Sequence, residues 1–204
     1  MATTQRIRRN IVLIGASAGG IPALMQVFEG LPPDFPATTA VVMHRSALAD
    51  SHLAEIFQRS ARLPLVEPED AMRIKPGTIY LAPRDHHLHL LNDHIEPRRG
   101  PKQHFARPAI DPLFTSAAET HGEHVVGVLL TGWGQDGVDG LIAIKREGGF
   151  VIVQDPEEAQ APSMPLNAVL HDHVDLVLPV ARIAAALVQL ARGDAIDLTR
   201  ANHP

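Results

Sequence analysis

A short apolar run that stops in glycines sets the pattern of this chain. The run Ile11–Ile14 is apolar and mostly β-branched, and Gly15–Gly20 follows it directly with the sequence Gly-Ala-Ser-Ala-Gly-Gly. Apolar residues then recur at helical spacing over Ile21–Glu29. This order predicts a buried strand, a tight turn and a helix. Ser17 lies in the turn, beside the free N–H groups with which a helix begins, so its hydroxyl is expected to face a ligand.

Three interpretations of this turn are open. The pattern Gly15-x-Ser17-x-Gly19 fits the nucleophile elbow of hydrolases, in which a serine occupies a sharp strand-to-helix turn. A dinucleotide-binding loop needs glycine in place of Ser17 and an acidic residue after the second strand, where this chain has His44. In the third interpretation the small residues only let the strand and the helix pack closely. The dinucleotide pattern fits least well, and the turn alone does not separate the other two.

Composition limits the class of protein. With 204 residues the chain is long enough to bury a core as one domain. It has no cysteine, which excludes disulfides, a thiolate nucleophile and a cysteine zinc site. A net charge of -5 and 4% aromatic residues argue against a nucleic-acid surface. No apolar run has the length of a membrane span or of a signal-peptide core, so we expect a cytoplasmic protein without membrane insertion.

Strand-length apolar runs alternate with segments at helical spacing, which is typical of βαβ units and a parallel sheet. We predict an α/β fold, with a doubly wound and mostly parallel sheet, helices on both faces and a short antiparallel hairpin insertion. The hairpin is expected to pair Gly77–Ala82 with His87–Leu91 through a turn at Pro83–Asp85. The expected parts of the chain are an N-terminal extension (1–9), one domain (10–192) and a C-terminal tail (193–204).

The remaining elements are expected in regular order. Further strands are predicted at Thr38–Met43, Val125–Leu130, Phe150–Gln154 and Val174–Leu178. Helices are predicted at Ser51–Arg62, Asp111–Thr120, Val138–Glu147, Met164–Leu170 and Val180–Leu190. Asp50 or Ser51 is expected to cap the first of these helices, and Asp111 the second.

Reactive side chains follow the ends of three predicted strands. Ligands of an open parallel sheet bind outside the carboxyl ends of its strands, where the strand order reverses. Ser17, His44 and Asp136 occupy such positions, so we expect them to meet at one edge of the sheet. They supply a hydroxyl nucleophile, an imidazole base and a carboxylate that orients the base. Asp139 is the alternative to Asp136, and an aspartate in a glycine-rich loop can instead cap a helix.

A cluster of histidines raises the question of a metal site. His86, His87 and His89 follow one another closely, and the last two would share one face of a strand. No carboxylate or cysteine accompanies them locally, although zinc usually recruits such partners. We therefore expect no metal site there.

Five motifs, in order, resemble those of the CheB-type protein-glutamate methylesterase catalytic domain. They are Ile14–Gly20, Met43-His44, Tyr80-Leu81-Ala82-Pro83-x-Asp85-x-His87, Arg107-Pro108-x-x-Asp111-x-Leu113-Phe114 and Leu130-Thr131-Gly132-x-Gly134-x-Asp136-Gly137. The resemblance runs from about Asn10 to about Leu190. It implies a doubly wound α/β fold and a serine hydrolase that demethylates glutamate γ-methyl esters on chemoreceptor helices. In some members the enzyme also deamidates glutamine there.

The resemblance also implies roles for individual residues. Ser17 resembles the nucleophile, His44 the general base and Asp136 the orienting carboxylate. No metal or organic cofactor is implied. The residues implied to donate to the oxyanion or to line the site are Ala18, Gly132, Trp133 and Gly134.

Departures from the family pattern surround the nucleophile. Trp133 stands where the family has methionine, Ala18 where it has threonine and Met43 where it has glutamine. They motivate a second hypothesis, a catalytically weak or inactive CheB-like binding or signalling module. A nucleotide-binding protein that uses the glycine turn as a phosphate cradle is the third.

The resemblance implies partners as well. Its substrate would be a methyl-accepting chemoreceptor or another glutamate-methylated signalling protein. Only Met1–Arg9 precede the first predicted strand, so we expect a stand-alone catalytic domain without the receiver domain of typical members. A separate receiver protein and a methyltransferase are candidate partners in its regulation.

Overall fold

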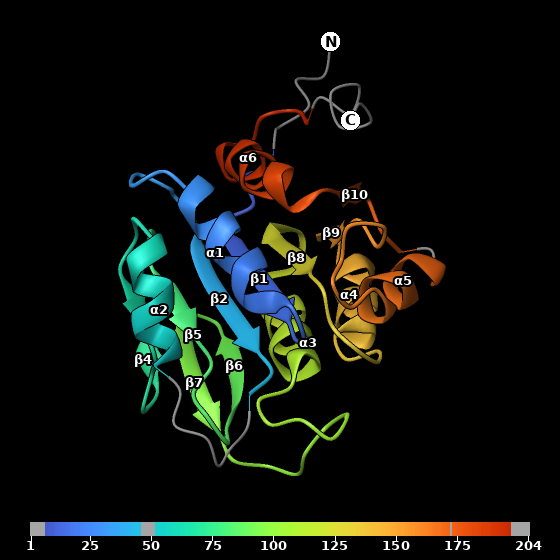
Figure 1. Ribbon diagram of the computed structural model, residues 1–204. Coiled ribbons are helices and arrows are strands. Elements are labelled where there is room, and N and C mark those ends of the chain that lie inside the picture. Colours follow the sequence, from blue (N-terminus) through green and yellow to red (C-terminus); the bar gives the residue numbers. More distant parts are fainter. Residues whose placement is uncertain (1–6, 46–51, 172, 197–204) are drawn as a thin grey trace.

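A parallel sheet forms the centre of the molecule in the computed structural model, which describes residues 7–45, 52–171 and 173–196 (Figure 1). The strands of this sheet are β1 (Ile11–Ala16), β2 (Thr38–Met43), β3 (Leu65–Val66), β5 (Ile79–Leu81), β8 (Val125–Leu129), β9 (Phe150–Gln154) and β10 (Leu176–Leu178). The seven strands lie in the order β10-β9-β8-β1-β2-β5-β3, and every neighbouring pair is parallel. The predicted doubly wound α/β fold is confirmed.

Helices cover both faces of this sheet (Figure 1). They are α1 (Gly20–Gly30), α2 (Leu53–Ser60), α3 (Ile110–His121), α4 (Val138–Arg146), α5 (Ser163–Leu170) and α6 (Val180–Arg192), with a 3-10 turn at Gly122–His124. Helices α1, α2 and α6 enclose one buried apolar cluster, and α3, α4 and α5 enclose the other. Successive residues of β1 alternate between the clusters, because Val12 and Ile14 belong to the first and Ile11 and Leu13 to the second. None of the helices in the described ranges is long and apolar enough to cross a bilayer.

A small antiparallel sheet is the predicted insertion, but its pairing was predicted wrongly. It consists of β4 (Met72–Arg73), β6 (His87–Leu91) and β7 (His94–Arg98), in the order β4-β7-β6. Ile79–Leu81 does not join it, since β5 pairs in parallel with β2. The hairpin partner of β6 is β7, which is not among the predicted strands and contains Pro97, a residue unfavourable in strands.

The site lies where the strand order reverses. From β1 the order runs through β2 to one edge of the sheet, and from β8 through β9 to the other. The segments that leave these central strands are bonded together there: the N–H of Ser17 donates to the Thr131 carbonyl, and that of His44 to the Ala16 carbonyl, each at 3.0 Å. Such a switch point is the usual ligand-binding position of an open α/β sheet.

Two predicted helix caps have different outcomes. Asp50 and Ser51, proposed as caps for α2, lie outside the described residues. Asp111 does not cap α3, because the helix begins at Ile110 and Asp111 lies inside its first turn. The N–H groups that begin α3 are instead bonded by a carboxylate from another loop.

Candidate active site

Ser17, His44 and Asp136 form one hydrogen-bonded chain at the carboxyl edge of the sheet. His44 Nδ1 lies 3.1 Å from Ser17 Oγ, and His44 Nε2 lies 2.6 Å from Asp136 Oδ2. The Asp136 side chain is 1% exposed and the His44 side chain 17%. The carboxylate is therefore shielded from water, whereas the ring and the hydroxyl can be reached from outside.

The two nitrogens of His44 have distinct roles. The Asp136 carboxylate only accepts hydrogen bonds, so Nε2 carries the ring proton and donates it. Nδ1 is then the acceptor and can take the proton of the Ser17 hydroxyl. The serine-protease template uses the two nitrogens the other way round, but it has the same single donor and single acceptor. Asp136 thus selects the tautomer in which His44 is a base toward Ser17.

The Asp136 carboxylate rests on the beginning of α3. Its Oδ2 accepts the N–H of Ile110 at 2.8 Å, and its Oδ1 accepts the N–H of Asp111 at 3.1 Å. Burial acts to raise the pKa of Asp136, but the hydrogen bonds from His44 and from these N–H groups outweigh it and hold the pKa below its usual value. The Asp136 carboxylate is therefore ionised at neutral pH.

Asp111 is a second buried carboxylate beside the first. Its Oδ1 accepts the N–H of Gly140, in the first turn of α4, at 2.7 Å, and its Oδ2 lies 2.9 Å from His104 Nε2. Asp136, just before α4, thus binds the start of α3, and Asp111, in α3, binds the start of α4. Burial and the nearby charge of Asp136 raise the pKa of Asp111 to about 6. Below that pH Asp111 holds a proton while Asp136 keeps its charge.

The Asp111→Asn variant is expected to gain stability relative to wild type as the pH rises from 4 to 6. Unfolded Asp111 releases its proton near its ordinary pKa of 3.8, whereas the folded protein holds the proton to about pH 6. Wild type therefore loses stability across this window, by at most about 3 kcal/mol, and the amide has no such loss. Urea unfolding at pH 4, 5, 6 and 7 measures the difference between the two proteins. A difference that does not change with pH would contradict the raised pKa.

Two backbone N–H groups are free beside Ser17, one in the turn after β1 and one in the loop after β8. Gly132 and Gly134 donate their N–H groups to acceptors at and just before the start of α5, each at 2.9 Å. Within the part of the chain that the structure describes, the N–H groups of Ala18 and Trp133 have no acceptor. Free N–H groups on two segments next to Ser17 are what an oxyanion hole requires.

Gly132 allows the loop after β8 to approach Ser17. A Cβ at this position would lie 2.8 Å from the Ser17 Cβ and 2.6 Å from Met164 Cε, both closer than side chains pack. Gly15 has the same function for α3, since a Cβ there would lie 2.6 Å from Ile110 Cγ2. The two glycines bring the loop after β8 and the start of α3 directly against the end of β1.

Motif residues for which the sequence suggested no role fix the segment before α3. Asp85 accepts hydrogen bonds from Arg107 Nε at 2.8 Å and from Arg99 at 2.5 Å. The bonds from these two guanidinium groups lower the pKa of Asp85 to about 2. His87, which is buried, accepts the N–H of Ala109 at Nδ1, 3.2 Å away. These contacts position the first turn of α3, on which the Asp136 carboxylate rests.

Comparison with known proteins identifies the family. The family model described as CheB methylesterase matches residues 12–187. The chain belongs to the CheB methylesterase family. The members of this family are carboxylic-ester hydrolases, which agrees with the enzyme class that the motifs of this sequence imply.

Relatives and a solved structure agree with this assignment. One relative is a Leptospira interrogans protein, which is 36% identical over 88% of this chain and 93% of its own length. Its provisional name gives two activities, protein-glutamate methylesterase and protein-glutamine glutaminase. Protein-glutamate methylesterase FrzG of Myxococcus xanthus is 39% identical over 88% of this chain, which spans 54% of that relative. The crystal structure of the Thermotoga maritima CheB methylesterase catalytic domain is 34% identical and matches 90% of this chain and all of that one, with a TM-score of 0.84.

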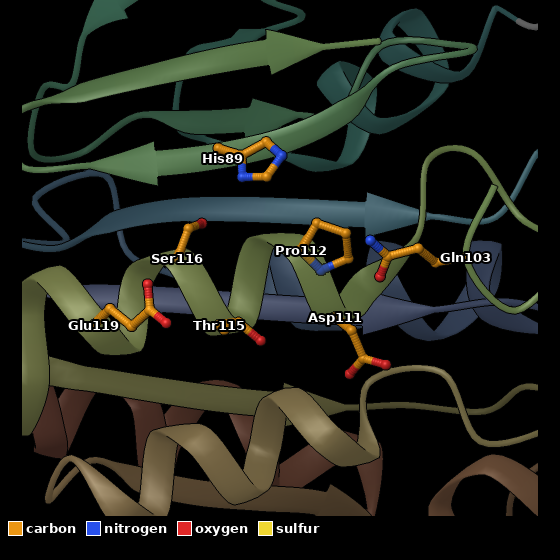
Figure 2. Close-up of a pocket in the computed structure, with 7 residues that line it drawn as sticks. All are labelled: His89, Gln103, Asp111, Pro112, Thr115, Ser116 and Glu119. Carbon is orange, nitrogen blue, oxygen red and sulfur yellow. The ribbon is translucent and has the colours of Figure 1, made fainter. Parts of the chain in front are cut away.

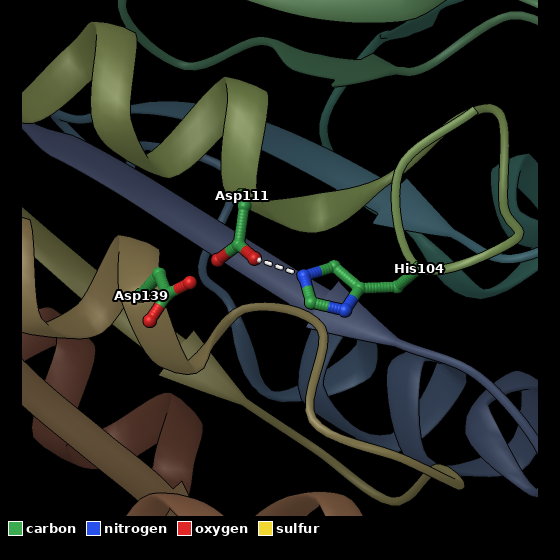
Figure 3. Close-up of side chains that lie close together, drawn as sticks. All are labelled: His104, Asp111 and Asp139. Atoms are coloured by element: carbon green, nitrogen blue, oxygen red, sulfur yellow. Dashed lines mark hydrogen bonds and ion pairs between the residues drawn. The ribbon is translucent and has the colours of Figure 1, made fainter. Parts of the chain in front are cut away.

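Three possible metal ligands of this CheB-family chain lie close together (Figure 3). One ligand atom each from His104, Asp111 and Asp139 lies within 4.8 Å of the others. Of the histidines in the described residues, His104 belongs to such a group, and His86, His87 and His89 do not. The hydrogen bonds of Asp111 already account for its position. His44 pairs with Asp136, so Asp139, the alternative considered from sequence, is not the member of the chain.

A cavity of about 320 Å³ lies along α3 (Figure 2). The three residues of the hydrogen-bonded chain are not among those that line it. Asp111 connects the cavity with that hydrogen-bonded chain, because it lines the cavity and its N–H donates to Asp136. The lining residues are His89, Gln103, Asp111, Pro112, Thr115, Ser116 and Glu119.

Proposed function

We propose that this chain hydrolyses glutamate γ-methyl esters in a methylated signalling protein of the chemoreceptor type, and that it also deamidates glutamine at such positions. The observation that carries the proposal is the continuous chain from Ser17 Oγ through His44 to the buried Asp136. The free N–H groups beside Ser17 support it, as do the names of the relatives, which give both activities.

In the first step Ser17 Oγ attacks the ester carbonyl carbon while its proton moves to His44 Nδ1. The carbonyl electrons move onto the oxygen, and the N–H groups of Ala18 and Trp133 stabilise the resulting oxyanion. The charge on the imidazolium is stabilised by Asp136 through Nε2. Each oxyanion donor contributes about 3 kcal/mol to lowering the barrier.

In the second step the tetrahedral intermediate collapses and the bond to the methoxy group breaks. His44 gives its proton to the leaving oxygen, so methanol departs and an ester of Ser17 remains. Water then attacks this ester as His44 takes a proton, and the glutamate carboxylate and the serine hydroxyl are released. With glutamine the leaving group is ammonia, and the same residues act in the same order.

A synthetic helical peptide with one glutamate γ-methyl ester tests the proposal. The purified protein is expected to release methanol from it, and ammonia from the matching glutamine peptide, at rates proportional to enzyme concentration. The free amino-acid derivative N-acetylglutamate γ-methyl ester serves as the smallest substrate. Absence of both products from all of these compounds would overturn the proposed function.

A further inference from the structure

Large apolar side chains are exposed on the loop after β8 and on the adjacent helix α5. Trp133 is 63% exposed, Leu166 44% and Leu170 70%. Single exposed apolar residues are common and need no explanation. Trp133, Leu166 and Leu170 differ from such single residues, because hydrogen bonds join the loop that holds Trp133 to helix α5, which holds the two leucines, beside Ser17.

One side of α5 holds the loop that contains Trp133. Ser163 Oγ accepts the N–H of Gly134 at 2.9 Å, and Asn167 Nδ2 donates to the Gly134 carbonyl at 2.8 Å. Leu166 and Leu170 follow Ser163 by three and seven residues, and such spacings fall on the same side of a helix. The exposed leucines therefore flank the contact with Gly134, the residue next to the tryptophan.

We propose that Trp133, Leu166 and Leu170 form a docking surface, here called the Trp133–α5 surface, for a helical segment of the protein substrate. This segment would present apolar side chains on the same face as its glutamyl ester. The inference rests on the proposed function and deepens it, because it names what the substrate must offer besides the ester.

Continuity with the reaction site supports this occupant. The N–H of Trp133 is free beside Ser17, and the ring of the same residue is exposed. An ester carbonyl bound at that N–H brings the neighbouring substrate residues over the ring. Side chains one helical turn further along, about 5.4 Å away, then come within reach of α5.

The spacing on α5 favours a helix over an extended strand. Leu166 and Leu170 are four residues apart, which places them one turn from each other and suits the i, i+3 and i+4 side chains of a second helix. Glutamate and glutamine, the residues modified, are also good helix formers. A substrate helix can therefore present the ester and its apolar neighbours together without unwinding.

The protein has a built-in reporter for this docking, since Trp133 is its single tryptophan. Two helical peptides without tryptophan or tyrosine each hold one glutamate γ-methyl ester. The first has leucine one and two turns from the ester on the same face, and the second has alanine there. Titrated into the Ser17→Ala variant, which preserves the ester, the leucine peptide is expected to shift Trp133 emission to shorter wavelength. It is expected to bind about tenfold or more tightly than the alanine peptide.

Turnover provides the second readout. For wild type, kcat/KM for the leucine peptide is expected to exceed that for the alanine peptide by about tenfold or more. This ratio should fall to near one in the double variant Leu166→Ser/Leu170→Ser. In Leu170→Ser alone, a milder change at the more exposed position, the ratio should fall by a smaller factor. Val177→Ser is the matched control, because Val177 is an apolar residue of β10 that is 39% exposed, and it should keep the wild-type ratio.

The outcomes separate this inference from the proposed function. Equal affinity for the two peptides with unchanged emission, or a ratio that survives the double leucine substitution, would overturn the docking surface while leaving esterase activity intact. Preferential binding of the leucine peptide without any methanol release would support the surface and contradict the esterase proposal.

Discussion

The Ser17→Ala variant is expected to hydrolyse a glutamate γ-methyl ester about a millionfold more slowly than wild type. The substitution removes the proposed nucleophilic oxygen and leaves the N–H groups of the proposed oxyanion hole in place. A residual rate about a thousandfold or more above the uncatalysed reaction is therefore expected from the remaining groups. Methanol release under single-turnover and steady-state conditions measures both values.

Ser60→Ala is the matched control for this experiment. Ser60 is the last residue of α2 and also has a hydroxyl, but it lies in a helix that contributes nothing to the triad. This variant should retain the wild-type rate. If Ser17→Ala retained more than about a hundredth of wild-type turnover, another group would have to be the nucleophile.

The Asp136→Asn variant is expected to lose about four orders of magnitude in kcat. An amide can donate to His44 Nε2, and the ring would then present a proton rather than a lone pair to Ser17. The folded structure should also lose about 1 to 3 kcal/mol, because one amide oxygen replaces two carboxylate oxygens that accept from the start of α3. Steady-state methanol release and urea unfolding measure the two effects separately.

Asp139→Asn provides the comparison for that variant. Asp139 is exposed, three residues further along the chain in the first turn of α4, and His44 does not pair with it. Its substitution should change kcat by less than about tenfold. Equal losses from the two substitutions would mean that local negative charge, rather than the bond to His44, supports activity.

The parallel sheet could be predicted because its strands bear a local signature. Runs such as Val125–Leu129 are buried on both faces and end in glycines, so they stand out as continuous apolar segments. The pairing of β5 and β6 could not be predicted in this way. Both are short apolar runs, and only contacts with distant strands decide that one enters the parallel sheet and the other a hairpin.

The three residues proposed for catalysis could be located because each follows the end of a central strand. The contacts that support these residues could not be predicted from the sequence. The bond from Gly140 to Asp111 and the pair of Asp85 with Arg107 join residues 29 and 22 positions apart. Nor does any sequence pattern indicate which nitrogen of His44 faces Ser17, since that depends on how the loops after β2 and β8 approach each other.

Labelling with a fluorophosphonate probe tests most directly whether Ser17, His44 and Asp136 form a working nucleophilic centre. We expect one equivalent of probe to react with the folded wild-type protein, mass spectrometry to place it on Ser17, and Asp136→Asn to slow the reaction. Folded protein that is not labelled, or is labelled at another residue, would mean that Ser17 is not an activated nucleophile.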